Sequence, residues 1–362
     1  MPPIGETARY AFGLLLVAFM GWSNPCKAQS PPLRMEPGLV SVSAIHDTVQ
    51  NKDYEQVTQV LSVDAAGTRF QQSWTIPDAS APDGVRQMTH EELSRAQDQQ
   101  SARRILLWYL KGDPETMPGT TSATPSEAVF DEIKTQGKTD VVIGSLSESD
   151  GGLVGGLLAG RKYFRGSLRL LGHQPARVLV DGIPTMLDAL HVGGQVSVGG
   201  ESANAEFLWL DRRELRWALS QTFQGSTVHI VRIDRPHNYR LQQELSSKSC
   251  RSEVPGVYFL TDSAQLLPQS RPAIEAIAAT LKSQPTWTVT IEGHTDSMGS
   301  DAHNLTLSQR RAESLKQELV EHYGIPAARL GTAGFGRARP IDTNETLEGR
   351  AHNRRVELAR RC

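Results

Sequence analysis

Two charged residues near the C-terminal end of the chain, Asp296 and Arg311, have the side-chain types and spacing of a site for a zwitterion. Asp296 follows an alternating apolar run at 287–292 that predicts a β-strand, and Arg311 lies fifteen residues later in a segment that predicts a helix. A carboxylate pairs with a ligand ammonium, and the planar guanidinium group of arginine binds a ligand carboxylate through two parallel hydrogen bonds. Thr295 and Asn304 would add neutral hydrogen bonds. The pattern predicts a site for a ligand that carries both an ammonium and a carboxylate.

The neighbours of Arg311 make its position unusual. Leu307, Arg311, Leu315 and Leu319 are spaced four residues apart, so they share one face of the predicted helix. An arginine in a stripe of leucines must find a carboxylate or keep its charged group in water, because burying an unpaired charge is costly. We therefore expect Arg311 to have a specific partner, either in the protein or in a ligand.

Arg354 is a second cation on an apolar face. It shares strand parity with Val356 and Leu358, so it is expected to point toward the same side as these two residues. A structural interpretation stays open beside the binding site. In that interpretation Asp296 and Arg311 form a buried ion pair with each other and bind nothing.

The elements around these residues predict an α+β fold for a C-terminal domain at 254–362. Two segments have helical apolar periodicity and four alternate as strands. The helices are expected at 268–283 and 303–323, and the strands at 256–261, 287–292, 330–335 and 354–359. The order strand, helix, strand, helix, strand, strand is typical of helices packed on a mixed sheet.

The region before this domain, 38–239, is expected to be a β-rich domain of unknown function, for which we favour a sandwich. Short alternating segments separated by Gly, Asp and Pro indicate strands. Helices are expected at 126–137 and at 89–100. A polar lead-in at 29–37 precedes the domain, and a polar linker at 240–253 comes after it.

Composition and motifs argue against several classes of function. The formal net charge is −2, whereas nucleic-acid binding normally requires a strongly basic face. The glycines between 151 and 160 are not followed by the G-K-[ST] of a phosphate-binding loop and are interpreted as a hairpin tip. His294 and Asp296 would supply only two ligands to a metal ion, which is weak support for a site. We expect no nucleic acid, no metal, no cofactor and no enzymatic activity.

The first 28 residues, 1–28, are predicted to be an export signal. Their apolar run at 11–22 is too short to span a membrane. Cys26 leaves lipidation open as an alternative. After cleavage, Cys250 and Cys362 would lie in an oxidising compartment, where we expect them to form a disulfide bond; the alternative is two free thiols.

A long series of motifs between residues 257 and 361 matches a known family. The motifs are G-H-T-D at 293–296, Asn304, L-S-Q-R-R-A at 307–312, G-F-G at 334–336 and G-R-A-H-N-R-R-V-E-L at 349–358. This segment resembles the OmpA-like peptidoglycan-binding domain, which also occurs in MotB-type stator proteins and peptidoglycan-associated lipoproteins. The resemblance implies that the ligand is the diaminopimelate residue of the peptidoglycan stem peptide. The family's site residues fall on Asp296, Asn304, Arg311 and Arg354. His303 stands where the family often has an aromatic residue.

The function implied by this resemblance is a non-enzymatic anchor in the periplasm of a Gram-negative envelope. The C-terminal domain would bind peptidoglycan, and the N-terminal domain would meet an outer-membrane or other envelope protein. Two alternatives stay open. One is an outer-membrane protein with an irregular N-terminal β-structure. The other is a wall-targeted enzyme whose catalytic site lies unrecognised at 38–239.

Overall fold

The computed structural model describes residues 33–47, 52–77, 85–107, 118–122, 124–146, 161–236 and 240–362. The predicted export signal with Cys26, the first four residues of the lead-in (29–32) and the glycines between 151 and 160 lie outside the described residues. Within the described residues, no helix is both long and apolar enough to cross a membrane.

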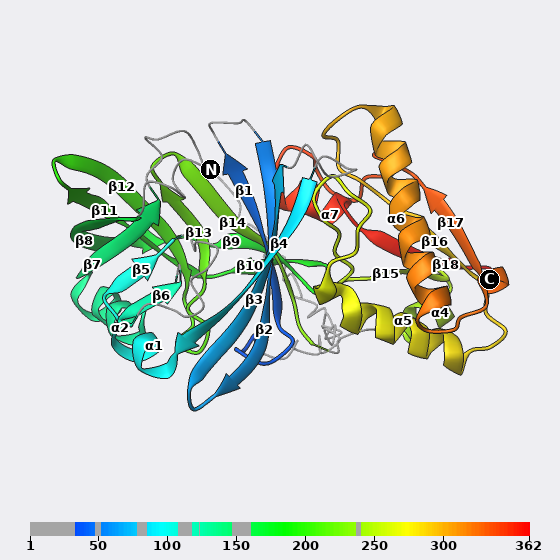
Figure 1. Cartoon of the computed structure of the whole chain (residues 1–362), viewed down its shortest axis with the longest axis horizontal. Coiled ribbons are helices and arrows are strands. Elements are labelled where there is room, and N and C mark those ends of the chain that lie inside the picture. The colour runs from blue at the N-terminus through cyan, green and yellow to red at the C-terminus, as the bar shows by residue number, and fades with distance from the viewer. Residues whose placement is uncertain are drawn as a thin grey trace, which may run out of the picture. The chain divides into compact units, whose positions relative to one another are not determined.

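The N-terminal part is β-rich, as predicted. Fourteen strands of the described residues join in one sheet. They are β1 (Val40–Asp47), β2 (Lys52–Asp64), β3 (Gly67–Pro77), β4 (Val85–Arg95), β5 (Arg104–Leu106), β6 (Thr120–Ser122), β7 (Lys138–Leu146), β8 (Arg161–His173), β9 (Ala176–Val180), β10 (Ile183–Leu187), β11 (Ala189–Val198), β12 (Glu201–Leu210), β13 (Ala218–Phe223) and β14 (Ser226–Asp234). The hydrogen-bonded path runs β4-β3-β2-β1-β14-β13-β12-β11-β8-β7-β5-β6, with β9 and β10 beside it (Figure 1). One continuous path replaces the two separate sheets of the expected sandwich.

Tight turns fix the register of several hairpins in this sheet. The two-residue connections at 181–182, 199–200 and 224–225 each have positive φ at both positions. This is the backbone of a type I′ turn, whose twist matches that of the flanking strands. Glycine occupies at least one position in each turn, because it adopts positive φ without steric cost. The turns therefore explain why β9–β10, β11–β12 and β13–β14 pair as neighbours.

One predicted helix of this part is confirmed and the other is largely wrong. Helix α2 (Glu127–Gln136) begins at Ser126, whose hydroxyl accepts a hydrogen bond from the Val129 amide (3.3 Å), and ends at Gly137 with φ of 72°. The expected helix at 89–100 is instead the end of β4 followed by the short α1 (Ala96–Ser101). The polar residues of β4 carry no helical period of their own, and pairing with β3 along the whole strand decides their conformation.

The C-terminal part has the predicted α+β fold. Its strands are β15 (Arg251–Glu253), β16 (Val289–Gly293), β17 (Leu330–Gly334) and β18 (Val356–Arg360), in the sheet order β15-β18-β16-β17. Its helices are α4 (Leu241–Ser246), α5 (Arg271–Ser283), α6 (Asp301–Glu321) and α7 (Leu347–Asn353), with short 3₁₀ turns at Pro268–Ser270 and Ala327–Arg329. The sheet is mixed, because β16 pairs parallel with β17 and antiparallel with β18. Helix α6 packs on β16 and β17 (Figure 1).

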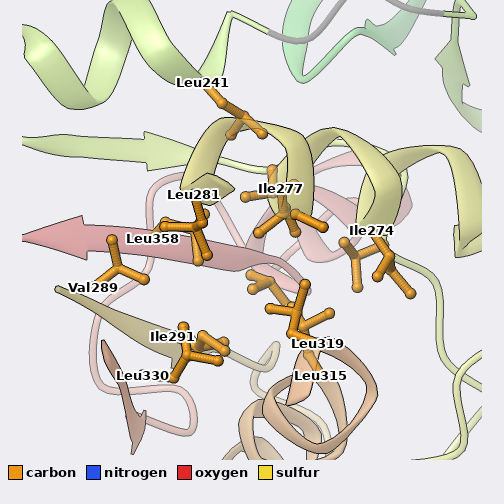
Figure 2. Packing of buried hydrophobic residues seen from close by; sticks show 14 of the residues in the cluster. Leu241, Ile274, Ile277, Leu281, Val289, Ile291, Leu315, Leu319, Leu330 and Leu358 are labelled. Carbon is orange, nitrogen blue, oxygen red and sulfur yellow. The ribbon is translucent and has the colours of Figure 1, made fainter. Parts of the chain in front are cut away.

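The core of this part lies between the helices and the sheet (Figure 2). Ile277 of α5 and Leu315 of α6 meet Ile291 and Leu358 of the strands, and all four side chains are buried. Burial of the apolar surface of each such side chain stabilises the folded state by about 1.5–3 kcal/mol. Leu241 of α4 belongs to the same cluster. The segment 240–253, predicted to be a linker, therefore contributes a helix and a strand to the core.

The first predicted strand, 256–261, is not formed. The place beside β18 belongs to β15, and the Val254 amide extends this pairing through a hydrogen bond to the Val356 carbonyl (2.9 Å). Pro255 then lacks an amide donor, and Gly256 with φ of 86° turns the chain away from the sheet. Beyond Gly256 the chain is irregular, with one isolated bridge between Phe259 and Leu266.

The expected disulfide bond joins Cys250 and Cys362, whose Cα atoms are 5.9 Å apart. Cys250 immediately precedes β15, and Cys362 lies just after β18. Because β15 and β18 pair antiparallel with Arg251 opposite Ala359, the ladder itself brings the two cysteines together. The bond ties the edge strand to the chain end.

Residues 34–362 form one compact unit rather than two domains separated by a free linker. A shared apolar cluster explains this. Val42, Val57 and Val231 of the N-terminal strands pack with Tyr258 and Leu260 of the C-terminal part. The candidate site lies next to this cluster.

Candidate functional site

Asp296 lies in the loop after β16. Its Oδ1 accepts a hydrogen bond from the Met298 amide (2.9 Å), and its Oδ2 accepts one from Nη1 of Arg354 (2.5 Å). The side chain is 10% exposed. Thr295 is buried as well, and its hydroxyl donates to the Asp296 carbonyl oxygen (3.0 Å). Both residues are thus held in a defined loop, with acceptor capacity of the carboxylate still available to a ligand.

A glycine allows this loop and the arginine helix to approach each other. A Cβ atom on Gly293, at the end of β16, would lie 2.2 Å from the carbonyl oxygen of Ser308 on α6. Only glycine fits so close a backbone contact. Gly293 therefore helps to place the Asp296 loop beside the helix that carries Arg311.

Asn304, in the first turn of α6, holds the loop in place. Its side-chain amide donates to the carbonyl oxygens of Met298 (2.8 Å) and Asp296 (3.3 Å). These two bonds use the donors of the amide group, which gives Asn304 a positioning role. A direct contact between Asn304 and a ligand stays a prediction.

Arg311 is buried, as its place in the leucine stripe predicts. Its Nε donates to the carbonyl oxygen of Ser263 (2.9 Å), Nη2 lies 3.4 Å from that of Leu260, and the guanidinium group stands 5.1 Å from the centre of the Phe259 ring. Burial lowers the pKa of Arg311 to about 10, partly opposed by the carboxylates of Glu55 and Asp296. The group is still charged at neutral pH.

Arg354 is the residue that pairs with Asp296. It caps the C-terminus of α7 instead of lying in a strand, and its Nη1 reaches Asp296 while its Nε reaches Glu55 (3.0 Å). Burial lowers the pKa of Arg354, but the nearby carboxylates of Glu55 and Asp296 raise it more, so the net shift is upward. The structural interpretation is therefore half right: Asp296 is in a partly buried ion pair, but its partner is Arg354 and not Arg311.

Glu55 is a member of the site that sequence reasoning missed. It lies on β2, opposite Ala44 of β1, and its carboxylate forms ion pairs with Arg354. Its backbone amide also donates to the hydroxyl of Thr261 (3.3 Å). One signal was present in the sequence, because Glu55 shares strand parity with the buried Val57 and is thus an acid on an apolar face.

A small, partly open pocket of about 40 Å³ lies at the three charged residues Glu55, Arg311 and Arg354. Arg232 and His294 also line it, whereas Asp296 does not. A water molecule needs roughly 10–15 Å³ in the same measure, so the space holds about three waters.

A second group of polar residues, Glu292, His294 and Glu357, places ligand atoms within 4.8 Å of one another. Arginines already neutralise the two acids: Nε of Arg355 bonds to Glu357 (2.7 Å), and Arg251 forms ion pairs with both carboxylates. Burial and then the charge of Arg355 lower the pKa of His294 to about 4. So much local positive charge disfavours a cation, and the group fits a structural ion-pair network better than a metal site.

Comparison with known proteins assigns this part of the chain. The model of the OmpA family matches residues 258–354. Residues 258–354 form an OmpA-family domain. The segment includes Asp296, Arg311 and Arg354, whereas Glu55 lies outside it.

Several relatives share this domain. "Outer membrane porin F" of Pseudomonas aeruginosa is 44% identical over 101 residues, which cover 28% of this chain and 29% of the relative. "Peptidoglycan-binding protein ArfA" of Mycobacterium tuberculosis is 40% identical over 102 residues, which cover 28% of this chain and 31% of the relative. The chain thus spans less than a third of the length of either relative.

The crystal structure of the peptidoglycan-associated lipoprotein from Burkholderia pseudomallei is 28% identical in sequence. It covers 33% of this chain and 99% of that protein, with a TM-score of 0.29. A TM-score this low does not by itself assign the fold of the whole chain. These three matches cover between 28% and 33% of this chain.

Proposed function

We propose that this chain binds peptidoglycan through the diaminopimelate residue of the stem peptide and anchors its N-terminal part to the cell wall of a Gram-negative envelope. The observation that carries the proposal is the buried Arg311 beside Asp296 inside the OmpA-family domain. Among the described residues, Arg311 bonds to backbone carbonyls and forms no ion pair. A ligand carboxylate would supply the missing anion.

In this mechanism the two charged ends of diaminopimelate meet opposite charges. Arg311 has five N–H donors, of which two are directed at the carbonyls of Ser263 and Leu260, so donors are left for a carboxylate. The Asp296 carboxylate accepts from the ligand ammonium. Asn304 keeps the Asp296 loop in position. Each charge-assisted contact contributes about 1.5–3 kcal/mol, less the cost of association. Single-site affinity is then modest, and a wall with many stem peptides raises the total attachment.

We further propose that the chain works in the cell envelope by binding rather than by catalysis. The names of the relatives, one an outer membrane porin and another a peptidoglycan-binding protein, support the location. The N-terminal part would then be held beside the wall, available to an outer-membrane or other envelope protein.

The test is sedimentation of the purified full chain, without its predicted export signal, with sacculi that contain diaminopimelate. Free diaminopimelate should compete for binding. We expect Asp296→Ala and Arg311→Ala to weaken binding about 10- to 100-fold, because each removes one charge-assisted contact. Arg310→Ala, at the exposed neighbouring position of α6, is the matched control and should bind as the wild type does.

Two results would contradict the proposal. Normal binding by both site variants would make Asp296 and Arg311 purely structural. Release of soluble wall fragments into the supernatant of the same experiment would show a hydrolase instead of an anchor. Circular dichroism of each variant verifies that the fold is kept.

A further inference from the structure

The side chain of Glu55 comes from a segment more than 200 residues away from the OmpA-family domain, yet it enters the centre of the candidate site. Its residue pair with Ala44 fixes which way β2 faces, and Val57 on the same side belongs to the apolar cluster shared with Tyr258 and Leu260. Glu55 is therefore directed at the site by the pleat of its own strand.

The contacts of Glu55 are those expected of a ligand carboxylate. Both Nε and Nη2 of Arg354 donate to one oxygen of Glu55, Oε1, so the side of the guanidinium group holds the carboxylate through charge-assisted hydrogen bonds. Glu55 is also the strongest source of negative charge acting on Arg311. The Glu55 carboxylate thus binds Arg354 directly and lines the same pocket as Arg311.

We propose that Glu55 is an internal competitor that holds its carboxylate in the pocket lined by Arg311 and Arg354 and disfavours binding of a ligand carboxylate there until β2 is displaced. This inference rests on the proposed function and concerns the regulation of the same site. Binding of diaminopimelate would bring the ligand carboxylate to Arg311 and displace the Glu55 carboxylate, while Arg354 keeps its ion pair with Asp296.

The position of Glu55 in the pocket supports competition with a ligand. Its side chain lines the pocket together with Arg311 and Arg354 and therefore takes up space beside both cations. Contacts away from Arg354 hold the strands in position. Nη2 of Arg232 donates to the Ala351 carbonyl (3.2 Å), and Nε2 of Gln269 donates to the hydroxyl of Ser73 (2.8 Å). Ligand binding must therefore work against several contacts, and the apparent affinity falls by the fraction of open molecules.

The decisive experiment measures the affinity of free diaminopimelate for the full chain by calorimetry. Glu55→Gln keeps the size of the side chain and removes its charge, so it should bind at least about tenfold more tightly than the wild type. Glu91→Gln, an exposed acid on β4, is the matched control and should not change the affinity. Equal or weaker binding by Glu55→Gln, with normal binding by the wild type, overturns the inference and leaves the proposed function intact.

Hydrogen exchange provides a second measurement that does not depend on a variant. Addition of diaminopimelate to the wild-type chain should increase amide exchange in residues 55–60 of β2, because the strand leaves the site. Unchanged or slower exchange there on binding would overturn the inference. If neither the wild type nor Glu55→Gln binds diaminopimelate, the proposed function fails and the inference fails with it.

Discussion

At the scale of single residues, Arg354 is the centre of the site. It lies between two carboxylates, one from its own domain and one from β2, and its side chain is 22% exposed. Removal of one member of a buried ion pair is expensive, because the remaining charge loses both its partner and its water. Arg354 is therefore expected to stabilise the folded protein in addition to its proposed role at the ligand.

A double-mutant cycle measures how much the interaction between Arg354 and Glu55 contributes to the free energy of unfolding. Arg354→Met should lower the free energy of unfolding by about 3–5 kcal/mol, because Asp296 and Glu55 are left without their cation. Glu55→Gln in the Arg354→Met background should recover part of the loss, with a coupling energy of about 1–3 kcal/mol from urea unfolding. Arg310→Met is the exposed control and should change stability by less than about 0.5 kcal/mol. Strict additivity of the two site changes would show that Glu55 and Arg354 do not interact.

The sequence indicates three of the charged residues of the site strongly and Glu55 only weakly. Arg311 and Arg354 are notable in the sequence because each is a cation among apolar residues, and Asp296 because it comes after an apolar strand. Glu55 carries the weaker signal of strand parity with Val57. Its contact with Arg354 spans 299 positions, and no local spacing encodes a contact of that range.

At the scale of elements, the helices α5 and α6 and the strands β16, β17 and β18 were predictable, and the short β15 was not. Helix α6 is expected from the sequence at 303–323 and runs Asp301–Glu321, because the hydroxyl of Ser300 caps its start and Gly324 with φ of 67° lies just beyond its end. β15 has three residues, too few to show any period. The sequence predicts a helix at the end of β4, but pairing with β3 decides the conformation of that segment.

The disulfide bond gives a prediction about β15 and β18. Replacing both Cys250 and Cys362 by Ser should lower the free energy of unfolding by about 4–5 kcal/mol, because the bond spans 112 positions and restricts a long loop in the unfolded chain. Denaturant unfolding of the oxidised wild type and of this variant measures the difference. The affinity for diaminopimelate should be unchanged, because Arg354 precedes β18 and Cys362 lies beyond it. As a control, a reductant added to the wild type should lower the free energy of unfolding by the same amount. The prediction is contradicted if the oxidised wild type and the double Cys→Ser variant have equal free energies of unfolding.

At the scale of the whole molecule, charged contacts as well as apolar packing join residues 34–362. Arg177 of β9 forms an ion pair with Asp342, and Asp342 accepts a hydrogen bond from Nδ1 of His352 (3.0 Å). The other ring nitrogen of His352 lies 3.6 Å from a carboxylate oxygen of Glu253. His352 therefore links a strand, a loop and a helix, and its charge should influence the stability of the whole unit.

The effect of pH on this link has a definite sign. Burial lowers the pKa of His352, but the carboxylates of Glu253 and Asp342 raise it more, so the pKa in the folded protein lies above the ordinary 6.5. The stabilisation is then fully present below about pH 6.5 and is lost as the pH rises through the folded pKa. His229 and His294 have lowered pKa values and act in the opposite sense, but below about pH 6.5.

Urea unfolding between pH 6.5 and pH 8.5 therefore isolates the contribution of His352. The wild type should lose about 1–2 kcal/mol over this range relative to His352→Gln, because the hydrogen bonds of a charged imidazolium to two carboxylates are lost. His322→Gln is the matched control, since His322 is an exposed histidine at the end of α6 that pairs with Glu318. Its pH dependence should follow that of the wild type. The same slope in His352→Gln as in the wild type would mean that the charge of His352 does not help to hold residues 34–362 together.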